Sequence, residues 1–137
     1  MIIMKSKKIL FIKRGNTTFE NIDFEILSKH YQTKIYIPNF KNTYKGIKLI
    51  FNSDLLYYWF PGDYKFLFTV IAKLFRKKIL VVGGGQMSTA DSKTKRRIAT
   101  VKYRPFYILL GKISLKLADR IIAVSDYEKK GISRYIN

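Results

Sequence analysis

Short apolar runs alternate along the chain with segments of helical periodicity. Five runs rich in β-branched and aromatic residues predict buried strands: Lys8–Ile12, Thr33–Ile37, Leu55–Trp59, Lys78–Val82 and Arg120–Val124. Thr17 with Glu20, and Ser125 with Glu128, fit the capping-box pattern that begins a helix. Continuous apolar strands separated by amphipathic helices indicate a Rossmann-like three-layer α/β domain, with a mainly parallel sheet of about five strands covered on both faces.

The helix expected between residues 64 and 76 has the clearest helical period. We expect its buried face to hold six apolar residues: Tyr64, Leu67, Phe68, Ile71, Leu74 and Phe75. We expect four polar residues to face solvent: Lys65, Thr69, Lys73 and Arg76. The basic segment Lys41–Lys48 predicts a loop or a weak helix. Pro105 suits the first turn of a later helix, with an apolar stripe at Phe106, Leu110, Ile113 and Leu117.

Charge and composition narrow the classes of function. The 137 residues fit one domain, and 27 Lys and Arg against 9 Asp and Glu give a net charge of +18. This excess predicts an anionic partner: nucleic acid, an acidic membrane surface or a phosphorylated substrate. The absence of cysteine and the single histidine exclude disulfide scaffolds, thiolate sites and multi-histidine zinc sites. No apolar stretch is long enough to span a membrane, so we expect a cytoplasmic protein.

Ligands of parallel sheets bind beyond the carboxyl ends of the strands. The candidate site therefore comprises the loops that we expect there: Lys13–Thr18, Phe60–Asp63, Gly83–Arg104 and Ser125–Tyr127. Arg14-Gly15 follows the first strand and precedes a helix N-terminus, where an anion can dock; an ordinary turn also explains it. Gly83-Gly84-Gly85 after the fourth strand fits either a ligand-facing loop or a sharp turn. The basic run Lys93–Arg104 fits either phosphate contacts or a solvated face. No dinucleotide or Walker A motif is present.

Four stretches in this order resemble the N-terminal domain of GT-B fold glycosyltransferases, especially the retaining family 4 type. They are Lys8–Gly15, Ser53–Phe60 (SDLLYYWF), Lys77–Gly85 (KKILVVGGG) and Leu117–Gly131 (LADRIIAVSDYEKKG), of which the last is the most specific. The resemblance implies a transferase that moves a sugar from a nucleotide-sugar donor to an acceptor. It also implies that this domain mainly holds the acceptor, and that neither an essential metal ion nor another cofactor is needed.

The resemblance and the loop positions together give the candidate substrate-binding residues. They are Arg14, Gly15, Asn16, Gly84, Gly85, Gln86, Met87, Arg96, Arg97, Arg104 and Ser125. By position, Gly15 would approach the donor phosphates and Ser125 would cap a helix near the cleft. The family often has aspartate where Gln86-Met87 stands, which puts a direct polar role of that loop in doubt. We assign no catalytic residue.

The family continues into a donor-binding second domain, whereas this sequence ends at Asn137. We therefore interpret residues 1–137 as a single acceptor-side domain without the C-terminal donor domain, and expect no sugar transfer by this chain alone. The expected partners are a sugar acceptor, an anionic inner membrane face, and a separate donor-binding domain or subunit. The alternative is a basic α/β nucleic-acid-binding module without catalysis, although the signature motifs of such modules are absent.

Overall fold

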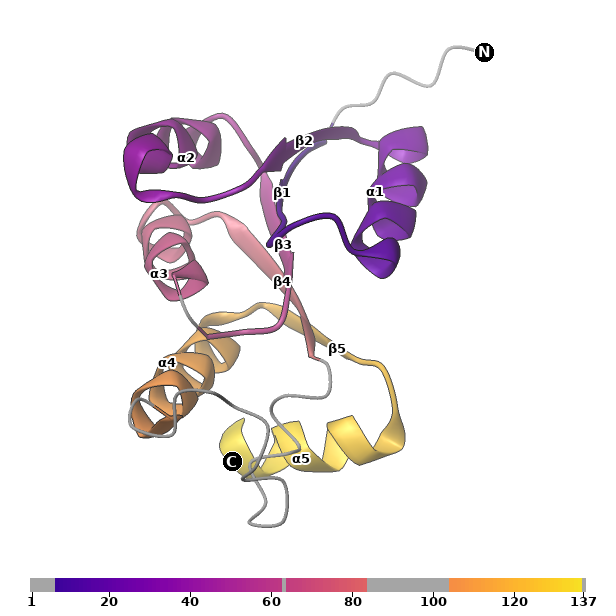
Figure 1. The fold of residues 1–137 in the computed structure, drawn as a ribbon, viewed down its shortest axis with the longest axis vertical. Helices are drawn as coiled ribbons and strands as arrows, with labels where there is room; N and C mark the ends of the chain where they lie inside the picture. The colour runs from indigo at the N-terminus through magenta and orange to yellow at the C-terminus, as the bar shows by residue number, and fades with distance from the viewer. Residues whose placement is uncertain (1–6, 63, 84–103, 137) are drawn as a thin grey trace.

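The structure is a computed structural model of the chain, and it describes residues 7–62, 64–83 and 104–136. In chain order the elements are β1 (Lys8–Ile12), α1 (Thr18–His30), β2 (Gln32–Tyr36), the 3-10 helix η1 (Phe40–Asn42), α2 (Thr43–Phe51), β3 (Leu55–Trp59), α3 (Lys65–Leu74), β4 (Lys78–Gly83), α4 (Arg104–Leu117), β5 (Arg120–Ala123) and α5 (Asp126–Ile136). The five strands form one parallel sheet in the order β2-β1-β3-β4-β5 (Figure 1). The predicted α/β Rossmann-like fold is confirmed.

The strand order reverses between β1 and β3. The chain passes from β1 to β2 on one side of the sheet centre, then returns to place β3 on the other side of β1. Ile12, at the end of β1, is therefore in register with both Tyr36 of β2 and Tyr58 of β3. In doubly wound sheets such a reversal separates the two following loops and leaves a crevice at the carboxyl edge.

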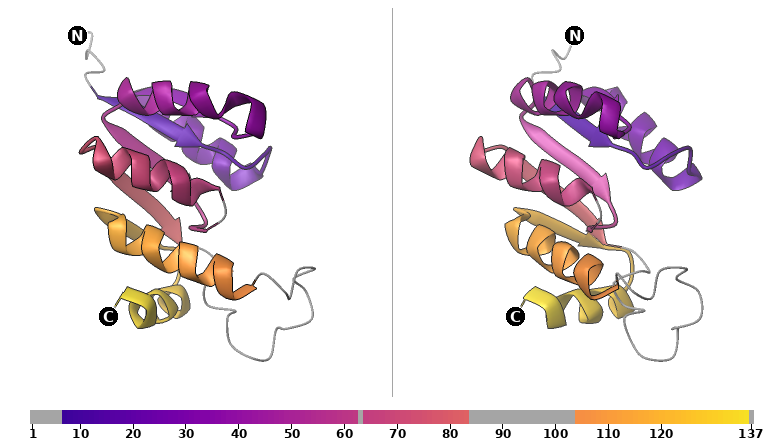
Figure 2. Two further views of the ribbon diagram at one scale, coloured as in Figure 1. Left: turned by 90° about the vertical axis from the view of Figure 1, so that its left-hand side faces the viewer. Right: turned by 60° about the vertical axis from the view of Figure 1, so that its left-hand side comes forward.

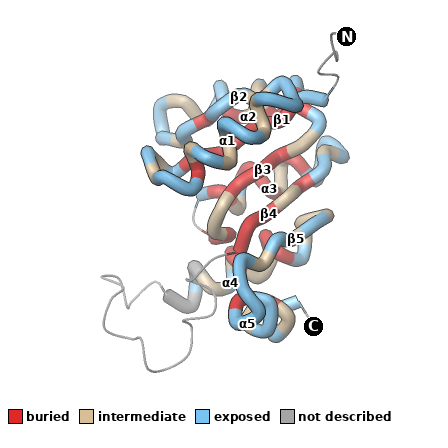
Figure 3. The backbone as a smooth tube through the Cα atoms, turned by 90° about the vertical axis from the view of Figure 1, so that its right-hand side faces the viewer, coloured by how far each residue is buried: buried red, intermediate tan, exposed pale blue. Residues whose placement is uncertain are grey.

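Two unequal layers cover the sheet (Figures 1 and 2). Helices α2, α3 and α4 lie side by side on one face, and α1 lies on the other face over β1 and β2. The larger core, which includes Leu10, Leu56 and Phe68, lies under the three helices. The smaller one centres on Phe11 and Tyr57 beneath α1. Figure 3 shows burial concentrated along the central strands.

Helix α3 presents a different face to the sheet from the one that its hydrophobic period predicts. Lys65 and Thr69 are buried, whereas Leu67, Leu74 and Phe75 are exposed. The Thr69 hydroxyl donates to the Lys65 carbonyl at 2.8 Å and shares a hydrogen bond of 2.7 Å with the Tyr58 hydroxyl. The prediction was wrong for these five residues and for Tyr64, which is exposed as well. The reason is that hydrogen bonds to the Tyr58 hydroxyl and to backbone carbonyls satisfy the inward polar groups of α3.

Where the sequence predicted a loop or a weak helix, the structure has the α-helix α2, which several contacts hold in place. Asn39 and Asn42 exchange hydrogen bonds that cap η1. The Tyr36 hydroxyl then donates to the Asn42 side-chain oxygen at 2.9 Å. A Cβ on Gly46 would lie 2.5 Å from the Tyr36 ring, so the glycine lets α2 pack directly on that ring. These contacts anchor a segment whose sequence is mostly polar and basic.

The other sequence-based details have mixed outcomes. The α4 stripe is wrong at Phe106, which is exposed, because α4 turns Ser114 and Leu115 towards the core. Thr17 makes no side-chain cap bond to the α1 backbone; its hydroxyl donates to Glu20 instead, at 2.5 Å. The Ser125 hydroxyl does accept the Glu128 amide, at 3.2 Å, as half of a capping box would.

Two aspartates at the amino ends of strands hold neighbouring strands together. Asp54 accepts the backbone amide of Lys8 at 2.8 Å, and Asp119 accepts that of Ile79 at 2.9 Å. Burial alone would raise the pKa of Asp119, but the Ile79 amide and the Lys73 ammonium outweigh it, so the pKa lies below its ordinary value. Both aspartates belong to stretches that carry the family resemblance. In both, the carboxylate has a structural role, because it accepts a backbone amide of the neighbouring strand.

Candidate functional site: the switch point at the carboxyl edge

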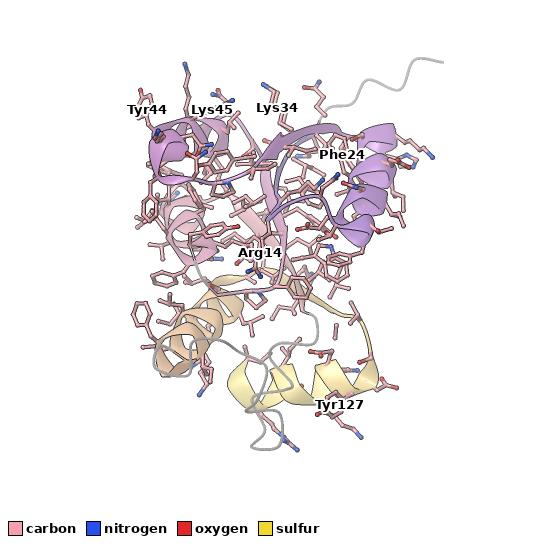
Figure 4. All side chains as sticks on the ribbon, viewed as in Figure 1. Arg14, Phe24, Lys34, Tyr44, Lys45 and Tyr127 are labelled. Atoms are coloured by element: carbon pink, nitrogen blue, oxygen red, sulfur yellow. The ribbon has the colours of Figure 1, made fainter. Side chains whose placement is uncertain are left out.

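The strand order reverses at β1, and we call the carboxyl edge of the sheet at this place the switch point. The loop between β1 and α1 lies on one side of it. Lys13 is buried there, and its ammonium group donates to the side-chain oxygen of Asn21 in α1. Glu20, 1% exposed, accepts the Arg14 amide at 3.4 Å as well as the Thr17 hydroxyl. The buried carboxylate thus occupies the Arg14 amide, which an anion would otherwise use. An anionic ligand is better served here by the exposed Arg14 side chain (Figure 4).

The segment that follows β3 lies on the other side of the switch point. Phe60 adopts a left-handed conformation with φ of 56°, which is rare for a bulky residue and marks a constrained turn. The buried Lys65 donates to the Phe60 carbonyl at 3.2 Å, and the Phe60 amide donates to the Val82 carbonyl at 2.9 Å. Contacts from α3 and β4 therefore hold this turn beside the end of β1.

Three aromatic rings connect the start of α1 with the segment after β3. The Phe19 ring in the first turn of α1 lies 4.6 Å from the Trp59 ring and 5.7 Å from the Phe60 ring, measured between centroids. Asp23 fixes the indole, because its carboxylate accepts the Trp59 N–H at 2.7 Å and the Tyr57 hydroxyl at 2.5 Å. Burial, with the hydrogen bond and charge of Asp23, raises the pKa of Tyr57 well above its ordinary value.

The structure places only some of the predicted site residues. Arg14, Gly15 and Asn16 lie together in the β1–α1 loop, and the space around Gly15 would admit a Cβ without contact. Six predicted residues lie outside the described residues: Gly84, Gly85, Gln86, Met87, Arg96 and Arg97. Arg104 is the first residue of α4. Ser125 is exposed at the start of α5.

The sequence placed Lys13 and Phe60 at the start of two loops at this edge, but we named neither of them, nor Lys65, as a site residue. In the part of the chain that the structure describes, four charged side chains are buried, and three of them flank the switch point: Lys13, Glu20 and Lys65. Lys13 directly follows β1, whereas Glu20 and Lys65 lie in the first turns of α1 and α3. No sequence signal marked their burial, because lysine and glutamate are ordinarily assigned to solvent.

Other kinds of site are not supported among the described residues. They contain no group of three or more histidine, aspartate or glutamate side chains placed to hold a metal ion. Within the same ranges, no helix is both long and apolar enough to cross a membrane. A separate hollow of about 240 Å³ lies at the amino edge of the sheet, away from the switch point, and Lys8, Lys34 and Ser53 are among its lining residues.

Comparison with known proteins adds a likeness of fold. No protein-family model and no curated protein sequence matches this chain. A crystal structure from Listeria monocytogenes, assigned as a UDP-N-acetylglucosamine 2-epimerase, is similar over 93% of the chain, with a TM-score of 0.61 and 13% sequence identity. The chain spans 41% of the length of that protein. At this identity the likeness shows the fold alone, which is that of a Rossmann-like domain.

Proposed function

We propose that this chain is the acceptor-binding half of a glycosyltransferase, which moves a sugar from a nucleotide-sugar donor to a phosphorylated or lipid-linked acceptor. The observation that carries the proposal is the cluster of buried charges and aromatic rings at the switch point, where sheets of this kind bind their ligands. The fold, shared with a protein assigned as a sugar-nucleotide epimerase, and the glycosyltransferase-like motifs support the sugar chemistry.

In this proposal different residues of the site bind different parts of the acceptor. Arg14 is exposed and carries a planar guanidinium, which matches the oxygens of a phosphate group. Trp59 and Phe60 offer apolar ring faces on which a sugar or an isoprenoid chain can lie. Asp23 and Lys65 act as positioning residues, because they hold the indole and the Phe60 turn.

Transfer also needs groups that these residues do not supply. A departing nucleoside diphosphate must be stabilised and the acceptor hydroxyl held in line, in a cleft closed to water. We propose that a donor-binding domain, in a continuation of the chain or in a separate subunit, provides them. The isolated 137-residue chain is then expected to bind acceptor and to transfer no sugar.

Trp59 is the only tryptophan, so its fluorescence reports directly on the site. The chain is titrated with a short water-soluble isoprenyl pyrophosphate, and we expect a saturable change in emission. Arg14→Ala should weaken binding more than about tenfold, since a hydrogen bond to a charged group contributes about 1.5–3 kcal/mol. Lys34→Ala, at the opposite edge of the sheet, removes the same charge and should have no effect.

Two results would count against the proposal. An unchanged Trp59 emission would show that the switch point does not take a pyrophosphate acceptor. Sequence-selective binding of single-stranded RNA at physiological salt, weakened by Arg14→Ala, would favour the nucleic-acid-binding module instead.

A further inference from the structure

The three helices on one face of the sheet contain no acidic residue. Helices α2, α3 and α4 have the sequences TYKGIKLIF, KFLFTVIAKL and RPFYILLGKISLKL. They carry seven basic residues: Lys45, Lys48, Lys65, Lys73, Arg104, Lys112 and Lys116. Lys65 is buried, whereas Lys45, Lys48, Lys73 and Lys116 are exposed. Helix α1, on the other face, carries three acids in thirteen residues: Glu20, Asp23 and Glu25. The positive charge of the protein is therefore unevenly divided between its two layers.

The same three helices leave large apolar side chains exposed. Tyr44 of α2 is 80% exposed and Leu74 of α3 is 74% exposed. Others on these helices or directly beside them are Phe40, Phe51, Leu67, Phe75, Phe106 and Leu109. The rings of Phe51 and Phe75 lie 3.9 Å apart, which joins the ends of α2 and α3 into one surface. In Figure 4 Tyr44 and Lys45 project from α2 towards the top of the view.

Apolar and cationic side chains alternate on this surface. Along α2 the exposed residues are Tyr44, Lys45, Lys48 and Phe51, and along α3 they are Leu67, Lys73 and Leu74. Figure 2 shows the three helices stacked as one layer that faces outward. We call the exposed side chains of η1, α2, α3 and α4 the helix-layer surface. Its combination of lysines with aromatic and leucine side chains is typical of elements that lie in the interface of a lipid bilayer.

We propose that the helix-layer surface docks on an anionic lipid membrane. Lysines bind the negatively charged headgroups, while the apolar side chains enter the boundary between headgroups and acyl chains. Charge complementarity favours this occupant, because helices free of acid meet no repulsion from an anionic sheet of headgroups. The exposed leucines favour lipid over nucleic acid, which offers bases for aromatic stacking but little that would bury aliphatic side chains.

The orientation follows from the fold and does not depend on the sugar chemistry proposed above. With the helix layer flat on the membrane, the sheet lies parallel to the bilayer and α1 faces away from it. The carboxyl edge, with Arg14, then opens sideways just above the headgroups. An acceptor anchored in the bilayer would reach this edge without leaving the membrane.

Vesicle co-sedimentation of the full 137-residue chain tests the proposal. The vesicles are neutral phosphatidylcholine alone, or phosphatidylcholine with about a third phosphatidylglycerol. We expect binding only to the anionic vesicles, weakened by added salt because charges are screened beyond ~10 Å at 0.1 M. Equal binding to both vesicles, or no binding to either, would overturn the proposal.

Matched variants locate the surface. Lys45→Glu with Lys48→Glu should weaken binding by at least about 25-fold, since each lysine near the surface contributes roughly fivefold. Lys129→Glu with Lys130→Glu makes the same change of charge on α5 and should weaken binding much less. Tyr44→Ser with Leu74→Ser should also weaken binding, whereas Ile22→Ser with Ile26→Ser, at exposed positions of α1, should not. Equal effects of the matched pairs would overturn the assignment of the face.

A cysteine-free chain allows a direct readout of orientation. A polarity-sensitive fluorophore is attached to Tyr44→Cys or to Ile26→Cys. We expect a blue shift on anionic vesicles at position 44 and none at position 26. The opposite pattern would overturn the proposal. So would a dimer in solution that the Tyr44 and Leu74 substitutions dissociate without any vesicle binding, because a second copy would then be the occupant.

Discussion

The two layers that cover the sheet use charge in opposite ways. Helix α1 turns two of its three acids towards the protein: Asp23 holds Tyr57 and Trp59, and Glu20 is buried beside the β1–α1 loop. The α2–α4 layer has no acid and leaves exposed lysines and large apolar side chains. The first layer therefore organises the switch point, and the second leaves exposed the surface that we propose docks on a membrane. One sheet can carry both layers because they cover its opposite faces.

The largest expected effect contrasts two apolar residues of α3. Phe68 is 2% exposed and packs edge-on against Tyr36, so Phe68→Ala should lower the free energy of unfolding by about 3–5 kcal/mol. Leu74→Ala, at an exposed position of the same helix, should change it by less than about 0.5 kcal/mol. Urea unfolding measures both. Similar losses from the two substitutions would mean that α3 buries the face predicted from its period.

The next effect concerns the acids of α1. Asp23→Ala removes the acceptor of both the Tyr57 hydroxyl and the Trp59 N–H, and should lower the free energy of unfolding by about 2–4 kcal/mol. Glu25→Ala, at an exposed position of α1, should have little effect. Trp59 emission should shift in the first variant even in the folded state. A stable Asp23→Ala protein with unchanged emission would show that this network does not organise the site.

A smaller effect tests how α2 is anchored. Gly46→Ala would stabilise an isolated helix by up to about 1 kcal/mol, yet the added Cβ would lie 2.5 Å from the Tyr36 ring. We therefore expect a net loss of about 1–3 kcal/mol in urea unfolding. Gly15→Ala is the control, because open space surrounds that position. Stabilisation by Gly46→Ala would show that Tyr36 moves aside without cost.

The smallest effect depends on pH and on Asp119. Because its pKa is lowered on folding, its contribution is complete above the unfolded value of about 4 and is lost as the pH falls through the folded value. Asp119→Asn should lower the free energy of unfolding at pH 7 by about 1 kcal/mol, and by less at pH 3. Glu25→Gln is the control. An equal deficit at both pH values would exclude a charge effect.

The sequence was a reliable guide where burial alone decides the structure. Lys8–Ile12 and Leu55–Trp59 are strands with the predicted bounds, because apolar runs bounded by polar residues have few alternatives in a parallel sheet. Helix α3 was misread because it is apolar on several sides, and the buried side is selected by bonds between residues far apart in sequence. The contact between Tyr58 and Thr69 is one of these.

The candidate site residues were chosen from topology. Arg14-Gly15-Asn16 was named because it follows a strand and precedes a helix, at the edge where parallel sheets bind ligands. Lys13 and Lys65 were passed over, since a lysine is ordinarily assigned to solvent and only the folded chain shows its burial. The left-handed conformation of Phe60 carries no sequence signal, because bulky residues rarely adopt it.

One titration tests most directly the central claim, that the switch point and the helix-layer surface are separate binding surfaces. Isoprenyl pyrophosphate is added to the natural chain and to the double variant Tyr44→Ser, Leu74→Ser, while Trp59 emission is followed. Both proteins are also tested for binding to anionic vesicles. We predict that the variant loses vesicle binding and keeps the same midpoint in the Trp59 titration. A variant that loses both activities together, or vesicle binding that survives unchanged, would contradict the account.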